Sequence, residues 1–144
     1  MQDSEKFYHS MNNRLLAVAA LLIAISVAMG AFGAHALNQV LTEKQLHSYD
    51  TAIKYQLFHA LALFCVGILQ GQLPSLNTKP VVNAFLLGIL LFGGSIYFNL
   101  VLETRNIAIP IFVRLITPLG GTAYIFAWLV LAYQLLLSGK KVEN

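Results

Sequence analysis

One uncharged apolar run constrains this chain more than any other feature. Residues 15–37 contain no Asp, Glu, Lys or Arg. An α-helix needs about 20 residues, at about 1.5 Å of rise each, to cross the hydrocarbon core of a bilayer, and this run offers about 23. The run therefore predicts a helix that spans a membrane.

The composition supports a membrane protein. Of the 144 residues, 58% are hydrophobic and 10% are charged, against about 45–50% and about 25% in soluble domains. Disordered and fibrous classes are excluded by the apolar content and the absence of a short repeat, and a disulfide scaffold is excluded because Cys65 is the only cysteine. We expect one all-α integral membrane domain over residues 1–144.

Three further runs predict three further spans. Residues 53–73 form the second, which is polar at its beginning, and residues 81–102 form the third. The last apolar stretch, residues 107–137, is too long for one crossing at about 31 residues. Thr117 followed by Pro118 is a favoured helix start. The fourth span is therefore predicted at residues 118–137, with an interfacial or re-entrant approach before it.

The segment ahead of the first span is polar. Residues 1–13 are predicted to be a mobile extension, and Met11 is an alternative start to Met1. Arg14 precedes the apolar run and Ala34-His35-Ala36 resembles a signal-peptide cleavage site. The run exceeds the usual core of about 7–15 residues and three spans follow, so we favour a retained span.

Residues 41–55 form the one long connection. Thr42 and Gln45 have the spacing of a capping box, and apolar residues recur at helical spacing at Leu46, Tyr49 and Ile53. This pattern predicts an amphipathic helix that lies on the outer membrane surface and leads into the second span. A lid helix in contact with water would show the same pattern.

Loop charges predict the orientation. With four crossings, both termini and the connection at residues 74–80 share one side, which carries Lys6, Arg14, Lys79, Lys140 and Lys141. The other side carries Lys44 and Arg105, with Lys54 and Arg114 at helix ends. The positive-inside rule therefore predicts cytoplasmic termini in a bacterial inner membrane.

Small residues repeat at spacings that suit close helix contacts in lipid. Because such positions occur on every span, we expect a compact four-helix bundle and possible homo-oligomers through the same faces. The expected packing positions are Ala20, Ala24, Ala28, Gly67, Gly71, Ala84, Gly88, Gly120, Gly121, Ala123 and Ala127.

Nearly all polar residues within the spans share one side under this threading, the side away from the termini. Ionisable groups at membrane depth are costly and are usually paired or functional. These residues form the candidate polar pocket or ligand-binding site: His35, Gln56, His59, Tyr97, Asn99, Glu103, Arg114 and Thr117.

Each candidate also has a structural interpretation, which we favour. His35 and His59 suit hydrogen bonds between helices, or else a proton or ligand role, and two imidazoles alone are a weak metal or haem signal. Glu103 and Arg114 suit an ion pair that closes the bundle, or else a site for an anionic group. The amides of Gly120-Gly121 suit close packing, or else anion binding.

Signatures of enzymes are absent from the sequence, which has no P-loop, HExxH, GxSxG or Cys-x-x-Cys motif. We therefore expect no enzymatic activity, no metal and no cofactor. The net charge of +3 is spread over termini and loops, so nucleic-acid binding is not expected.

Four motifs in order carry a family resemblance: GAFGAHAL at residues 30–37, YQLFHA at 55–60, FGGSIY at 92–97 and ITPLGG at 116–121, followed by Trp128. From Met11 to Leu137 the chain resembles the YgdD/YwdK-like family of small bacterial membrane proteins. The resemblance implies several membrane spans and supplies no reaction. The family-pattern residues are Gly30, Phe32, Gly33, His35, Tyr55, His59, Ser95, Tyr97, Thr117, Pro118, Gly120, Gly121 and Trp128.

Two functional hypotheses follow. The preferred one is a non-enzymatic accessory or scaffold protein of the membrane or envelope, acting with a membrane-protein partner or as a homo-oligomer. The alternative is a module that binds or transports a small amphiphile or ion through the polar pocket. A membrane-embedded enzyme or haem protein ranks third.

Overall fold

The computed structural model describes residues 13–139, which contain helices and no strand. Four helical segments there are long and apolar enough to cross a membrane, at Asn13–Gln39, Glu43–Gln72, Lys79–Thr104 and Ile111–Ser138. The prediction of an all-α fold with four transmembrane helices is confirmed. The expectations of a mobile extension and of a start at Met11 concern the region before Asn13, which lies outside the described residues.

Residues 13–139 form seven helical elements, three of which make up the third span. In order they are α2 (Asn13–His35), η1 (Leu37–Gln39), α3 (Glu43–Gln72), α4 (Lys79–Gly88), η2 (Ile89–Gly93), α5 (Gly94–Thr104) and α6 (Ile111–Gly139).

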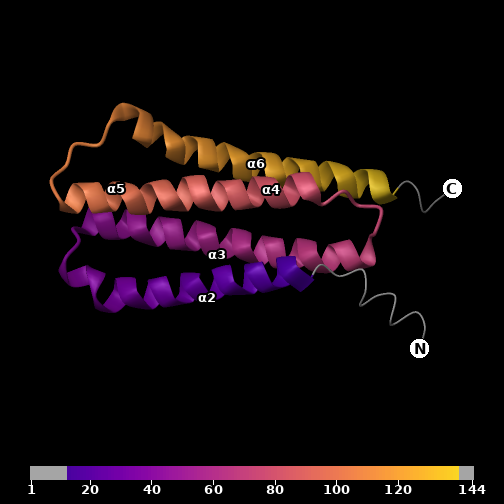
Figure 1. Cartoon of the computed structure of the whole chain (residues 1–144), viewed down its shortest axis with the longest axis horizontal. Helices are drawn as coiled ribbons and strands as arrows, with labels where there is room; N and C mark the ends of the chain where they lie inside the picture. Colours follow the sequence, from indigo (N-terminus) through magenta and orange to yellow (C-terminus); the bar gives the residue numbers. More distant parts are fainter. Residues whose placement is uncertain (1–12, 140–144) are drawn as a thin grey trace.

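The helices follow one another across the molecule in chain order (Figure 1). Helix α2 packs on α3, α3 packs on the third span, and the third span packs on α6. One end of the bundle holds the start of α2, the end of α6 and the connection at residues 73–78; we call it the terminal end. The other end holds the connections at residues 36–42 and 105–110; we call it the loop end.

Helix α3 is longer than the predicted second span. Thr42 and Gln45 form the capping box that the sequence predicts, with the Thr42 amide donating to Gln45 Oε1 at 3.0 Å. The helix then continues without a break to Gln72. The amphipathic segment is therefore the first turns of a spanning helix. Its apolar residues Tyr49 and Ile53 pack inside the bundle with Leu100.

The predicted helix start at Thr117-Pro118 is wrong. Helix α6 begins seven residues earlier, at Ile111, and Pro118 lies inside it. Proline at this position lacks the N–H that would bond to the carbonyl of Arg114. Such a loss is tolerated in membrane helices, where neighbouring groups adjust to the freed carbonyl. The predicted approach at residues 107–116 is thus partly the first turns of α6.

Helix α5 ends in a turn that redirects the chain at the loop end. Asn106 has φ of 56°, and the Ile107 amide donates to the Leu102 carbonyl at 2.9 Å while the Asn106 amide donates to Glu103 O at 3.0 Å. This pair of bonds is the Schellman pattern, and Asn is one of the few residues that tolerate its left-handed position. Helix α6 then starts after Pro110.

The third span contains one π-helical turn, η2, between α4 and α5. The Ser95 hydroxyl donates to the Phe92 carbonyl within this turn at 3.0 Å. A Cβ added to Gly120 on α6 would run into the backbone of Phe92. The π-turn and α6 therefore meet backbone to backbone, and only glycine fits at position 120 without a shift.

The glycines expected at helix contacts lie where two elements meet closely. A Cβ at Gly67 would come within 2.7 Å of the Leu16 side chain, and a Cβ at Gly88 would overlap the Tyr124 ring. Gly71 is also buried, whereas a Cβ at Gly121 would make an ordinary contact of 3.9 Å with Phe92.

The alanine stripe predicted for the first span is on the wrong face for packing within the chain. Ala20, Ala24 and Ala28 are exposed. The residues of α2 that are buried against the rest of the bundle are Leu15, Ala19, Ser26 and Gly33. Three of these four lie at seven-residue spacing, which keeps one narrow face of α2 toward α3 over several turns.

Candidate functional site

A buried polar network crosses the bundle from α2 to the third span. The Gln56 amide of α3 donates to Ser26 Oγ of α2 at 3.0 Å, and Ser26 in turn donates to the Leu22 carbonyl at 2.8 Å. The Tyr97 hydroxyl of α5 donates to Gln56 Oε1 at 3.5 Å. Gln56 therefore links three helices through one side chain.

His59 lies one turn further along α3 and uses both of its ring nitrogens. Nδ1 lies 2.7 Å from the Tyr55 carbonyl, which can only accept, so Nδ1 carries the hydrogen. Nε2 accepts a hydrogen bond from the Trp128 indole of α6 at 3.3 Å. This pairing corresponds to a neutral imidazole with its proton on Nδ1.

Aromatic rings enclose His59. Its ring stacks on Tyr124 with centroids 3.5 Å apart, and Tyr55 stacks on Phe92 of the π-turn at 4.6 Å. Phe85 meets the Trp128 indole edge-on at 5.1 Å. The hydroxyl oxygen of Tyr124 is buried and has no hydrogen-bond partner. We call these residues, with His59, the aromatic cluster.

A second polar contact joins the third span to α6 beside the π-turn. Ser95 Oγ and Thr117 Oγ1 lie 2.7 Å apart. Thr117 precedes Pro118 in the turn of α6 that packs near the π-turn. The hydroxyl pair thus ties the π-turn to the segment of α6 that contains Pro118.

The candidate pocket of the sequence prediction divides into separate groups. Gln56, His59, Tyr97 and Thr117 point into the interior, as described above. His35 is exposed at the end of α2. Contacts between α2 and α3 show that it lies far from His59, because Gly33 is next to Tyr49 and Ser26 bonds to Gln56. His35 therefore lies beside the beginning of α3, several turns before His59. The two histidines therefore do not face one cavity.

The expected ion pair between Glu103 and Arg114 does not form. Both side chains are exposed, and Glu103 instead accepts from the Gln45 amide at 3.4 Å. Within residues 13–139 the ion pair that the structure does contain joins Lys54 and Asp50 at 3.4 Å. Asn99 is half-buried, with a buried Oδ1 that has no partner.

No metal site is formed by the part of the chain that the structure describes, in which no three His, Cys, Asp or Glu side chains gather. His59, the one buried histidine of the sequence prediction, has both nitrogens in hydrogen bonds. A metal or haem iron would have to displace one of these bonds.

An apolar groove of about 420 Å³ opens at the loop end between α2, η1, α3 and α5. The edge-to-face pair of Tyr49 and Tyr97, with centroids 5.7 Å apart, lies in its wall. The Tyr49 hydroxyl donates to the Met29 backbone carbonyl at 2.9 Å. The full lining is Met29, Phe32, Leu37, Val40, Leu41, Tyr49, Tyr97, Leu100, Val101 and Thr104. We call this the loop-end groove.

The sequence prediction missed two important residues of the site. Ser26 is the one hydroxyl residue in an otherwise apolar stretch of the first span, and it lies seven residues from both Ala19 and Gly33. That isolation was a usable signal. Tyr124 has no comparable signal in the sequence, because its contact with His59 depends on the absence of a side chain at Gly88.

Comparison with known proteins places the chain in a family. A family model described as a protein of unknown function (DUF423) matches residues 29–121, which is more than half of the chain. The UPF0382 membrane protein of Haemophilus influenzae is 38% identical over 123 residues, covering 85% of this chain and 94% of that protein. The chain belongs to the DUF423 family.

Other DUF423-type relatives agree. The UPF0382 membrane protein YwdK of Bacillus subtilis is 35% identical over 115 residues, covering 79% of this chain and 89% of that protein. A UPF0382 membrane protein of Staphylococcus saprophyticus is 37% identical over 114 residues, with 79% and 89% covered. The YgdD/YwdK-like resemblance is therefore confirmed. No solved structure matches the chain.

The DUF423 match includes most of the site. It covers Gln56, His59, Ser95, Tyr97 and Thr117, as well as all residues that line the loop-end groove. It ends before Tyr124 and Trp128 and begins after Ser26. The family names establish a membrane protein and give no reaction.

Proposed function

We propose that this DUF423 protein is a non-enzymatic module of the bacterial inner membrane that binds an amphiphile with a hydrocarbon chain in the loop-end groove. The observation that carries the proposal is the groove itself. Its volume of about 420 Å³ lies within the range of about 300–1,000 Å³ that is usual for ligand pockets. Its walls are almost wholly aliphatic and aromatic.

The position of the groove suits a chain with a polar end. Val40 and Thr104 line it near the connections at residues 36–42 and 105–110, where the spans end. Met29 and Tyr97 line it further inside the bundle. A hydrocarbon chain can therefore lie among the apolar walls while its polar group remains at the loop end.

The polar network supports binding by holding the groove in shape. Tyr97 is fixed by its hydroxyl contact with Gln56, and Tyr49 by its bond to the Met29 carbonyl. The polar atoms of both tyrosines are thus used within the protein, and their ring faces and edges remain for apolar contact. This favours an amphiphile over an ion, for which the groove offers few free acceptors.

Native mass spectrometry of protein released gently from its own membrane tests this function. Val101→Trp should fill the groove, since Val101 lines it and is partly exposed. Val27→Trp is the matched control, because Val27 is an exposed α2 residue outside the groove. We expect one retained amphiphile on the wild type and on Val27→Trp, and its loss from Val101→Trp. Equal retention by all three proteins would refute binding in the groove.

An accessory or scaffold role is the second candidate. It is favoured by the exposed alanine face of α2, formed by Ala17, Ala20, Ala24, Ala28 and Ala31, because small residues allow a second helix to approach closely in lipid. The partner is a second copy or another membrane protein. Ala24→Leu should reduce a cross-linked multimer or partner complex in the membrane, whereas Val18→Leu should not, because Val18 is exposed on α2 away from the alanine face. Recovery of monomer alone from the wild type would refute this role.

A further inference from the structure

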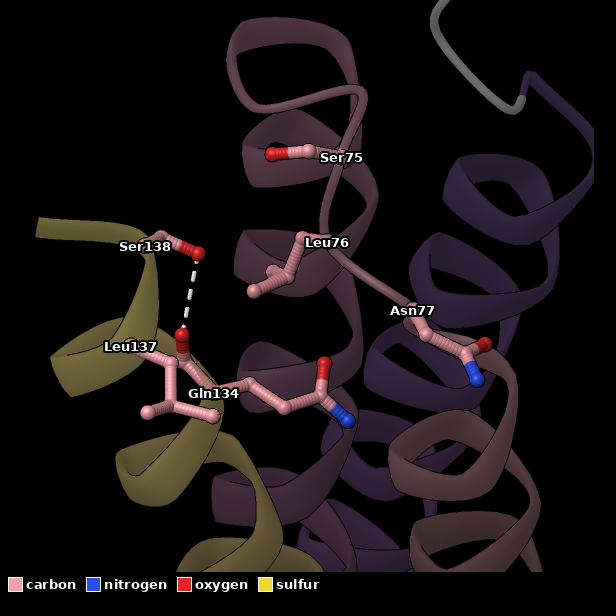
Figure 2. A pocket seen from close by; sticks show the side chains of 6 residues that line it. All are labelled: Ser75, Leu76, Asn77, Gln134, Leu137 and Ser138. Atoms are coloured by element: carbon pink, nitrogen blue, oxygen red, sulfur yellow. Dashed lines mark hydrogen bonds between the residues drawn. The ribbon is translucent and has the colours of Figure 1, made fainter. Parts of the chain in front are cut away.

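A small polar pocket lies at the terminal end, opposite the loop-end groove. It has a volume of about 300 Å³ and is formed by the connection before α4 and by the last turns of α6 (Figure 2). In this view the Gln134 side chain extends from α6 toward the connection that carries Ser75, Leu76 and Asn77. The lining residues are Ser75, Leu76, Asn77, Gln134, Leu137 and Ser138.

One acceptor in this pocket lacks a donor. Gln134 Oε1 is buried and has no hydrogen-bond partner. The hydroxyl of Ser138, which also lines the pocket, is already used, because it donates to the Gln134 backbone carbonyl at 2.9 Å (Figure 2). A buried oxygen without a donor is unfavourable, so the pocket is suited to a ligand that brings an N–H or O–H group.

The depth and charge of the pocket indicate the kind of ligand. Gln134 lies about one turn before the end of α6, where the apolar sequence of the fourth span stops. The ends of membrane-spanning helices lie at the level of the lipid headgroups. The ionised residues described at this end are basic, Arg14 and Lys79, while the described acids Glu43, Asp50 and Glu103 all lie toward the loop end.

We propose that this pocket binds the headgroup of a phospholipid that carries a hydrogen-bond donor, such as the ammonium of ethanolamine or a hydroxyl of glycerol. The donor bonds to Gln134 Oε1, and the phosphate lies at the basic terminal end. Leu76 and Leu137 provide apolar contact for the atoms next to the headgroup. A choline headgroup has no donor and cannot make this bond. The inference is independent of the proposed function, because the two sites are at opposite ends of the bundle.

Lipid addition to the delipidated full chain in detergent tests the proposal, with the melting temperature as the measurement. Phosphatidylethanolamine and phosphatidylcholine with identical acyl chains differ in the headgroup nitrogen, which carries three N–H donors in the first lipid and three methyl groups in the second. We expect a larger rise in melting temperature with the ethanolamine lipid for the wild type. Gln134→Leu should remove this difference. Gln70→Leu is the control, since Gln70 Oε1 is also buried without a partner but does not line the pocket.

Each further outcome decides the proposal. An equal response of the wild type to both lipids would overturn it, as would a difference that survives in Gln134→Leu. Stabilisation by free phosphoethanolamine without any effect of the lipid would overturn the assignment to a membrane lipid. If Gln134→Leu fails to fold, Gln134→Glu supplies the second variant, and it should keep a preference for the ethanolamine lipid because a carboxylate also accepts from the ammonium.

Discussion

The ring of Tyr124 lies parallel to the imidazole of His59, with centroids 3.5 Å apart and planes inclined by 11°. The two residues belong to α6 and α3, which are separated by the third span. Tyr124 reaches His59 by passing over Gly88 of α4, where a Cβ would overlap its ring. The missing side chain at Gly88 therefore allows two helices that are not neighbours to share one aromatic cluster.

Gly88→Ala should destabilise the protein by about 1–3 kcal/mol, the usual cost of overpacking a core. The new methyl group forces Tyr124 away from His59. Gly94→Ala is the control, since a Cβ there has no atom within 4 Å. Reversible unfolding in mixed detergent micelles measures both free energies. A Gly88→Ala protein as stable as Gly94→Ala would contradict the contact.

His59→Leu should shift the fluorescence of Trp128 to shorter wavelength, because the indole loses its acceptor. Trp128 is the one tryptophan of the chain, so the emission reports this bond directly. His47→Leu is a matched control on the exposed surface of α3 and should leave the spectrum unchanged. The same shift in both variants would show that the bond does not determine the emission.

The His59 and Trp128 pair should also couple energetically. The variants His59→Leu and Trp128→Phe and their combination form a double-mutant cycle. We expect a coupling free energy of about 0.5–1.5 kcal/mol, the usual range for a hydrogen bond. Additive effects of the two substitutions would indicate that the 3.3 Å contact contributes no stability.

Zinc ions and chelators should leave the melting temperature of the protein unchanged. Both nitrogens of His59 are occupied and His35 lies elsewhere, so a metal has no preformed ligand set. Thermal unfolding with added Zn²⁺ and then with EDTA tests this. A zinc-dependent rise that disappears in His59→Leu would refute it.

Cysteine labelling should find the termini on the cytoplasmic side. In a Cys65→Ala background, Ala108→Cys marks the loop end and Ser75→Cys the terminal end, since both positions are exposed. An impermeant maleimide added to right-side-out vesicles should label Ala108→Cys at once and Ser75→Cys only after permeabilisation. The reverse pattern would contradict the orientation that the loop charges predict.

Much of the fold was predictable because it depends on local chemistry. Uncharged runs of sufficient length predict the four spans, and the Thr42 and Gln45 capping box predicts where α3 begins. Because successive spans run in opposite directions, the sequence also predicts that Gln56, His59, Tyr97 and Thr117 lie in the same half of the molecule. These inferences need no knowledge of which helix faces which.

The failures concern the direction of helix faces and long-range contacts. The predicted packing stripe of α2 consists of alanines at four-residue spacing, whereas the face that packs on α3 contains Ala19, Ser26 and Gly33 at seven-residue spacing. Thr117-Pro118 has the local pattern of a helix start, but the helix already begins after Pro110. Glu103 and Arg114 are close to the same end of the bundle, yet Gln45 meets Glu103 instead.

The most direct test of the central claim is photo-crosslinking in the native membrane with a long-chain fatty acid that carries a photoreactive group along its chain. Peptide mapping then locates the labelled residues. Binding in the loop-end groove predicts that labels concentrate on Met29, Leu41 and Val101 and are competed by unlabelled fatty acid. Labels spread evenly over lipid-exposed residues such as Leu21 and Leu136, without competition, would contradict the proposed function.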